Sequence, residues 1–146
     1  SIDNFRTIDP ENFKTVDELK YVNSSGKEIS VDIILKSGDA SESGGGRTGI
    51  KPISSDGNIP ENKIFMTLDK NTGITSNRLA HEFGHAFSIS KSPLQYYQEL
   101  IKNPGHNCQD FGNRGSFLSK DAIDWQLQYD DKYKNYKQKN PSYNPK

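Results

Sequence analysis

The sequence predicts an α+β fold, in which a small mixed or antiparallel sheet packs on a helix that carries a His-Glu-x-x-His motif. Two segments predict strands. Residues 28–35 (EISVDIIL) are rich in β-branched side chains and begin with alternating polarity, and residues 62–68 (NKIFMTL) form a second apolar run. Helices are predicted by apolar residues at helical spacing in two segments after residue 74. The length of 146 residues fits a single domain.

The N-terminal half is expected to begin with one short helix. Phe13, Val16 and Leu19 recur at helical spacing, which predicts a helix near residues 11–21. A turn at 23–26 (NSSG) separates this helix from the first strand. Residues 37–57 are polar and rich in glycine, so we expect them to form a flexible, exposed loop.

Residues 44–49 (GGGRTG) in that loop match the G-x-G-x-x-G pattern of dinucleotide-binding turns. The pattern binds a pyrophosphate only when a helix begins directly after it. Here Pro52 disfavours helical backbone at Lys51, and Ile50 stands where a Walker loop has its lysine. The segment is therefore interpreted as a flexible loop and not as a phosphate site.

The C-terminal half is predicted to be helical. Thr75 or Ser76 can cap a helix that runs to about residue 89, and a shorter helix is expected over residues 93–101. Ser119 is the candidate N-cap of a final helix over residues 120–137. One side of this helix carries an apolar stripe of Ala122, Trp125, Tyr129, Tyr133 and Tyr136. The tail, residues 138–146, is expected to be frayed.

Composition excludes several classes of protein. Lys and Arg total 19, as do Asp and Glu, so no basic footprint for nucleic acid is present. No apolar run approaches the roughly 20 residues of a transmembrane helix. Hydrophobic residues make up only 31% of the chain, and the single cysteine, Cys108, excludes an intramolecular disulfide. We therefore expect a small core that is supplemented by long loops, or by a non-covalent group such as a bound metal.

His81, Glu82 and His85 form the one specific motif, His-Glu-x-x-His. On a helix, the two histidines are four residues apart and project from one face, so both imidazoles can reach the same Zn²⁺. Glu82 follows the first histidine and can act as a general base toward an attacking water. These residue types in this pattern predict two zinc ligands and a catalytic base.

A catalytic zinc site needs a third protein ligand. Asp121 lies roughly 80° from the centre of the apolar stripe of the last helix, whereas Asp124 lies roughly 140° away. Asp121 is therefore the preferred candidate, with Asp124 as a rival. His106 is the strongest rival, because the turn at 103–105 (NPG) could present its imidazole.

Residues 79–87 (LAHEFGHAF) resemble the active-site helix of zincin metallopeptidases, most closely the gluzincin-type branch. Together with residues 120–129 (KDAIDWQLQY), they are similar to small metallopeptidase domains of bacterial polymorphic toxins and secreted effectors. In those domains a later helix of the type E-x-A-x-x-x-E-N carries the third ligand. Asp121 and Gln126 stand near its acidic positions.

The resemblance implies a minimal zincin-like fold, one zinc ion per chain and endopeptidase activity on a protein or peptide substrate. It implies a secreted or delivered bacterial protein, here a mature fragment or an excised domain, which we expect to be monomeric. The strand before the motif helix, residues 62–68, would be the sheet edge that pairs with substrate. Candidates for stabilising the oxyanion are His106, Arg114 and Tyr129.

Two alternatives use the same motif. A non-catalytic binding module, or a degenerate protease, would hold a structural zinc in a closed site to which His106 or Cys108 adds a ligand. A zinc-dependent amidase would act on a non-peptide amide.

Overall fold

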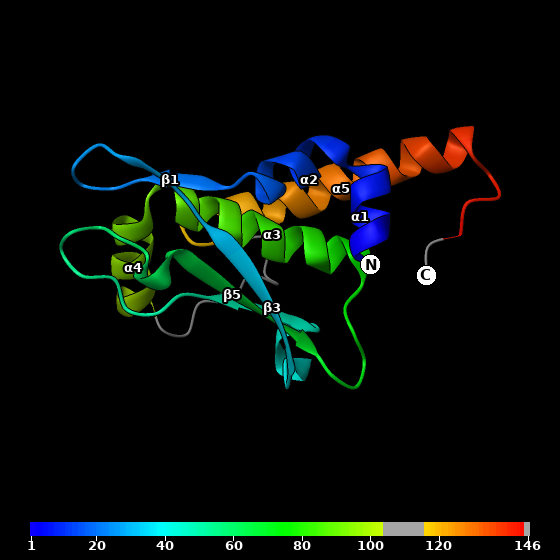
Figure 1. The fold of residues 1–146 in the computed structure, drawn as a ribbon. Helices are drawn as coiled ribbons and strands as arrows, with labels where there is room; N and C mark the ends of the chain where they lie inside the picture. Colours follow the sequence, from blue (N-terminus) through cyan, green and yellow to red (C-terminus); the bar gives the residue numbers. More distant parts are fainter. Residues whose placement is uncertain (104–115, 145–146) are drawn as a thin grey trace.

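In the described part of the chain, helices come first and last, and the strands of two small sheets lie between them in the sequence, which makes an α+β fold (Figure 1). This computed structural model describes residues 1–103 and 116–144. Its helices are α1 (Ile2–Ile8), α2 (Pro10–Asp17), α3 (Ser76–Lys91), α4 (Pro93–Lys102) and α5 (Lys120–Lys139). Its strands are β1 (Lys20–Val22), β2 (Glu28–Ser30), β3 (Asp32–Gly38), β4 (Gly46–Gly49) and β5 (Lys63–Asp69). Single 3₁₀ turns, η1 (Ser41–Ser43) and η2 (Pro60–Asn62), precede β4 and β5.

The N-terminal segment forms two helices where one was predicted. Asp9 separates them, and its carboxylate accepts a hydrogen bond from the Asn12 N–H at 3.3 Å, so Asp9 caps α2. Pro10 occupies the first position of α2, where its missing N–H costs nothing. The predicted strand 28–35 also divides, because β2 pairs with β1 in a hairpin while β3 joins a second sheet.

The three-stranded sheet has the order β3-β5-β4, with β5 parallel to β3 and antiparallel to β4. β5 confirms the strand predicted over residues 62–68, but the prediction that this strand is a sheet edge is wrong. Where β4 and β3 both pair with β5, at residues 65–68, the backbone of β5 has no open edge for a substrate strand. The edges of this sheet are β3 and β4.

The prediction of a flexible loop over residues 37–57 is wrong for β4, which lies in the middle of that segment. Four residues with two glycines show little strand propensity, but their main chain pairs with β5 from Gly46, opposite Leu68, to Gly49, opposite Phe65. The Asp69 carboxylate also accepts a hydrogen bond from the Ala40 N–H at 3.0 Å. These contacts hold the segment against the end of β5.

α3 lies between the sheet and α5 (Figure 1), and it confirms the helix predicted after Thr75. Leu79 and Phe83 pack with Met66 of β5 and Trp125 of α5 in one buried cluster. A second cluster joins Ala86 and Ile89 of α3 to residues of β1, β5 and α4. α4 and α5 agree with the helices predicted over residues 93–101 and 120–137.

The C-terminal tail is ordered as far as the structure describes it, and the frayed tail that we predicted is wrong there. Tyr143 packs edge-on against Tyr136, with ring centroids 4.9 Å apart. Its hydroxyl donates a hydrogen bond to Asn4 Oδ1 of α1 at 2.8 Å. In the parts of the chain that the structure describes, no helix has both the length and the apolar character needed to cross a membrane.

Candidate metal centre

The three motif side chains lie together in the middle of α3. One donor atom from each of His81, Glu82 and His85 falls within 4.8 Å of the other two. Their relative exposures are 1%, 3% and 7%, so all three are buried. The imidazole rings face each other nearly edge-on, with centroids 4.9 Å apart. The helical spacing of four residues produces this pairing, as the sequence predicts.

His81 is held by α5. Its Nδ1 lies 2.9 Å from Gln126 Oε1, an amide oxygen that can only accept a hydrogen bond. This contact puts a proton on Nδ1, which leaves the Nε2 lone pair of the neutral ring to bind a metal. Outer hydrogen bonds of this kind fix the tautomer and the orientation of histidine ligands.

His85 is held by α4. Its Nδ1 lies 3.1 Å from the Tyr96 hydroxyl, and this tyrosine is itself buried. When the hydroxyl accepts a hydrogen bond from Nδ1–H, Nε2 is left as the metal-binding nitrogen of His85 as well. Both histidines are therefore oriented through Nδ1, by residues from two different helices.

Glu82 is held by β4 and by the preceding turn of α3. Thr48 Oγ1 donates a hydrogen bond to Glu82 Oε1 at 2.8 Å, and Arg78 Nη2 lies 3.9 Å from Oε2. Burial raises the pKa of the Glu82 carboxyl above its ordinary value, while the Thr48 hydrogen bond and the Arg78 charge partly offset this effect. A carboxylate with a raised pKa binds a proton more strongly, which makes it a better general base near neutral pH.

Gly84 lets α5 approach the motif closely. A Cβ atom at this position would lie 2.7 Å from Ala122 Cα and 2.7 Å from the Asp121 carbonyl oxygen. Only glycine therefore permits this distance between the two backbones. The same crossing brings Gln126 of α5 to His81.

The structure leaves Asp121 outside the cluster. Its carboxylate forms an ion pair with Lys91 at 2.7 Å, at the C-terminal end of α3. Within the described residues, the group of possible metal ligands contains only the three motif side chains, so Asp124 does not join it either. The assignment of Asp121 as third ligand stays a prediction. His106 and Arg114, with Cys108, lie outside the described residues.

Tyr129 lies in the aromatic core, and its role at the oxyanion stays a prediction. Its ring is buried and stacks on Phe5 and Tyr133, with centroid distances of 6.1 and 6.3 Å. Its hydroxyl lies near Ser76, at the start of α3, about one turn before His81. Burial raises the pKa of the Tyr129 hydroxyl, as expected for a phenol in the core.

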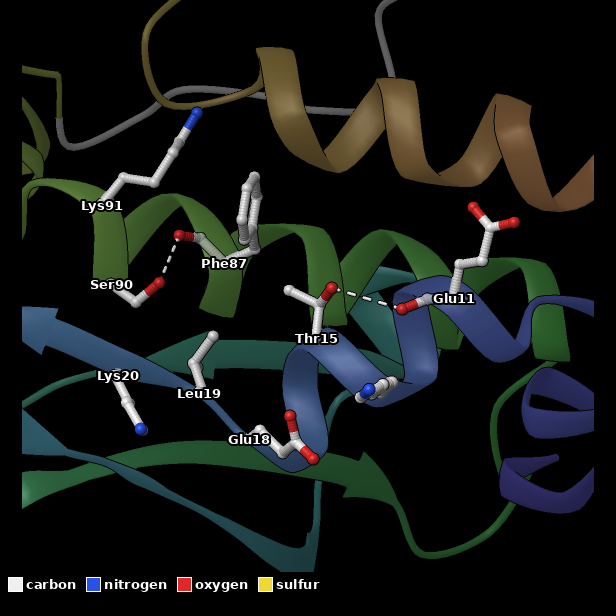
Figure 2. Close-up of a pocket in the computed structure, with 9 residues that line it drawn as sticks. Glu11, Thr15, Glu18, Leu19, Lys20, Phe87, Ser90 and Lys91 are labelled. Carbon is white, nitrogen blue, oxygen red and sulfur yellow. Dashed lines mark hydrogen bonds between the residues drawn. The ribbon is translucent and has the colours of Figure 1, made fainter.

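A separate pocket of about 350 Å³ lies where α2 and the start of β1 meet the C-terminal part of α3 (Figure 2). Phe87, Ser90 and Lys91 line it from α3, and none of the motif residues does. The Lys91 ammonium, which pairs with Asp121, also lies 4.9 Å from the centre of the Phe87 ring. The Asp121 carboxylate therefore forms its ion pair with a lysine that lines this pocket.

Sequence reasoning did not identify the three residues that hold the motif. Gln126 was noted only as standing near an acidic position of the resembled helix, and Tyr96 and Thr48 carried no signal. Each comes from a different element, α5, α4 or β4, and reaches α3 through tertiary packing. Residue spacing within a single element cannot reveal such contacts.

The buried group of two imidazoles and a carboxylate could bind a metal ion. Two imidazole nitrogens and a neighbouring carboxylate are typical of protein sites for Zn²⁺, whereas Mg²⁺ and Ca²⁺ prefer all-oxygen ligands.

Comparison with known proteins adds no relative: no family model matches the chain, and neither a curated protein nor a solved structure shows significant similarity to it.

Proposed function

We propose that this protein is a zinc-dependent metallopeptidase in which His81 and His85 bind the metal and Glu82 is the general base. The observation that carries the proposal is the buried cluster of the three side chains, with both imidazoles held through Nδ1. Burial of ionisable groups costs free energy. Two histidines and a glutamate buried at ligand spacing are therefore not expected on an ordinary amphipathic helix. The substrate in this proposal is a protein or peptide, and the resemblance supports a secreted or delivered bacterial protein.

The residues of the chain have distinct tasks in this reaction. A bound zinc would lower the pKa of a water molecule and polarise the scissile carbonyl. Glu82 takes a proton from the water as the new C–O bond forms, and then delivers it to the leaving nitrogen as the C–N bond breaks. The Gln126 and Tyr96 contacts keep the two imidazoles fixed while this happens.

The decisive experiment compares wild type with Glu82→Gln. Both proteins should bind one zinc per chain, as measured by elemental analysis, because the histidines are intact. Zinc-loaded wild type should cleave peptides in a proteome-derived mixture that is read by mass spectrometry. Glu82→Gln should lose this cleavage by at least about 100-fold, because an amide cannot accept the proton.

Glu28→Gln, the same exchange at an exposed position of β2, is the matched control and should behave as wild type. Full activity of Glu82→Gln would overturn the mechanism. A wild-type protein that binds zinc but cleaves no peptide would instead support the non-catalytic binding module. His81→Ala should lose the metal in either case.

The third ligand is chosen among Asp121, Asp124 and His106 by zinc affinity. Loss of a true ligand should weaken zinc binding by more than the roughly 10- to 100-fold that loss of an outer hydrogen bond costs. Asp121→Asn, Asp124→Asn and His106→Ala, each titrated against a zinc-buffered indicator, separate the candidates. If none of the three weakens binding, all three assignments are wrong.

A further inference from the structure

The glycine-rich segment at residues 44–49, which has no helix after it, lies against the candidate base. Its strand β4 alternates in burial: Gly46 is buried, Arg47 is exposed and Thr48 is half-buried. Because side chains alternate across a strand, positions 46 and 48 face the same side. Both contact Glu82 of α3.

Gly46 leaves room for the stem of Glu82. A Cβ atom at position 46 would lie 2.8 Å from Glu82 Cγ and 2.5 Å from Ile74 Cδ1. Distances this short essentially never occur for real Cβ atoms, so any side chain here would displace both Glu82 and Ile74. The glycine therefore serves the close packing of β4 against α3.

Thr48 binds the head of Glu82. Its Oγ1 lies 2.8 Å from Oε1 and 3.3 Å from the Glu82 backbone oxygen. The hydroxyl has a single proton, and the shorter distance and the negative charge both favour donation to the carboxylate. One oxygen of the carboxylate is thereby fixed by a residue of the sheet.

The second oxygen of Glu82 is placed differently. Oε2 has an ion-pair contact with Arg78 Nη2 at 3.9 Å but, within the described part of the chain, no hydrogen bond. Arg78 is itself held in place, because Nη2 donates a hydrogen bond to the Ser43 carbonyl at 3.2 Å. A distance of 3.9 Å orients the carboxylate by charge without occupying the lone pairs of Oε2.

We propose that β4 positions the base: the Thr48 hydroxyl holds Oε1 of Glu82, so that Oε2 is the oxygen that exchanges the proton during hydrolysis. This inference rests on the proposed function. Thr48 is a positioning residue and does not itself touch the reacting atoms. Fixing one oxygen saves the reorganisation that a freely rotating carboxylate would need at each turnover.

The test compares Thr48→Val, which replaces the hydroxyl by a methyl group of similar size, with Thr48→Ser, which keeps the hydroxyl. For the peptide that zinc-loaded wild type cleaves fastest, Thr48→Val should lower kcat between about 10-fold and about 100-fold. KM and the zinc Kd should stay within about twofold of wild type, and Thr48→Ser should recover most of kcat. The matched control is Thr67→Val on β5, whose partner across the strands is Arg47 and not Thr48. It should leave kcat unchanged.

A second measurement is independent of activity. In the zinc-free protein, NMR couplings of the Glu82 side chain should report one rotamer in wild type and in Thr48→Ser, and averaging over several rotamers in Thr48→Val. Unchanged couplings in Thr48→Val, or a loss of kcat that is equal in Thr48→Ser and Thr48→Val, would overturn the proposal. If wild type cleaves no peptide, the proposed function fails, and the couplings alone then decide whether Thr48 positions Glu82.

Discussion

Each side chain of the His-Glu-x-x-His motif contacts a residue from another part of the fold. Gln126 and Tyr96 contact the two histidines, and Thr48 contacts Glu82. Buried polar groups need such partners, since an unsatisfied one costs about 1–3 kcal/mol. The motif thus depends on three residues that have no fixed spacing from it in the sequence.

Asp69, at the end of β5, is a second residue whose environment can be tested. Its carboxylate accepts hydrogen bonds from the Ala40 N–H at 3.0 Å, the Thr72 N–H at 2.9 Å and the Thr72 hydroxyl at 2.7 Å. These donors, with the Ala40 N–H as the largest contributor, lower the pKa of Asp69 to about 2. The ionised form is therefore favoured by folding.

The pH dependence of Asp69→Asn follows from this shift. Because the folded pKa lies below the ordinary value of 3.8, the stabilisation is complete above about pH 4 and is lost as the pH falls toward 2. Asp69→Asn should therefore melt at a lower temperature than wild type at pH 6, with the difference shrinking between pH 4 and pH 2. Circular dichroism melts measure it, with Asp17→Asn as a surface control. A difference that stays constant down to pH 2 would refute the assigned cause.

At the scale of elements, the crossing of α3 and α5 determines the geometry of the site. Gly84 costs α3 about 1 kcal/mol of helix propensity relative to alanine. In exchange, the two backbones approach until a Cβ at position 84 would lie 2.7 Å from Ala122 Cα. Backbone atoms cannot move aside by changing rotamer, so the crossing tolerates no side chain at this point.

Gly84→Ala should therefore destabilise the protein although alanine favours helices. Overpacking costs about 1–3 kcal/mol, and a clash with backbone atoms lies toward the upper end, above the gain of about 1 kcal/mol in propensity. The forced separation should also move Gln126 away from His81 and weaken zinc binding by about 10-fold. Urea denaturation and zinc titration measure the two effects. Gly49→Ala is the control, since a Cβ there would meet no atom within 4 Å. A more stable Gly84→Ala protein would show that α5 can move away freely.

The elements differ in how well the sequence predicted them. α3, α5 and β5 are long or strongly patterned, and their predicted bounds agree with the structure within about two residues. β4 was missed because four residues with two glycines have no side-chain pattern, and the strand exists only through main-chain pairing with β5. The edge position of residues 62–68 was wrong for the same reason, since β4 covers that side of β5.

At the scale of the whole molecule, the proposed zinc would add stability to a chain that is only 31% hydrophobic. A metal that binds the folded state alone stabilises it by about 2.7 kcal/mol at a concentration of 100 Kd. For a chain of this length, zinc removal should lower Tm by about 5–10 °C. Calorimetry with and without a chelator measures the shift, and His81→Ala should show none. An unchanged Tm in wild type would mean that no stabilising zinc is bound.

The sequence alone determined the residues that can carry chemistry, because an i, i+4 histidine pair around a glutamate is a local property of one helix. It likewise determined the α+β class and the apolar face of α5, which follow from periodicity. Only the tertiary structure decided that Asp121 pairs with Lys91, that Tyr129 lies in the core and that Thr48 binds Glu82. The Asp121–Lys91 and Thr48–Glu82 contacts join residues 30 or more positions apart, and they depend on how backbones cross and pair rather than on any spacing along the chain.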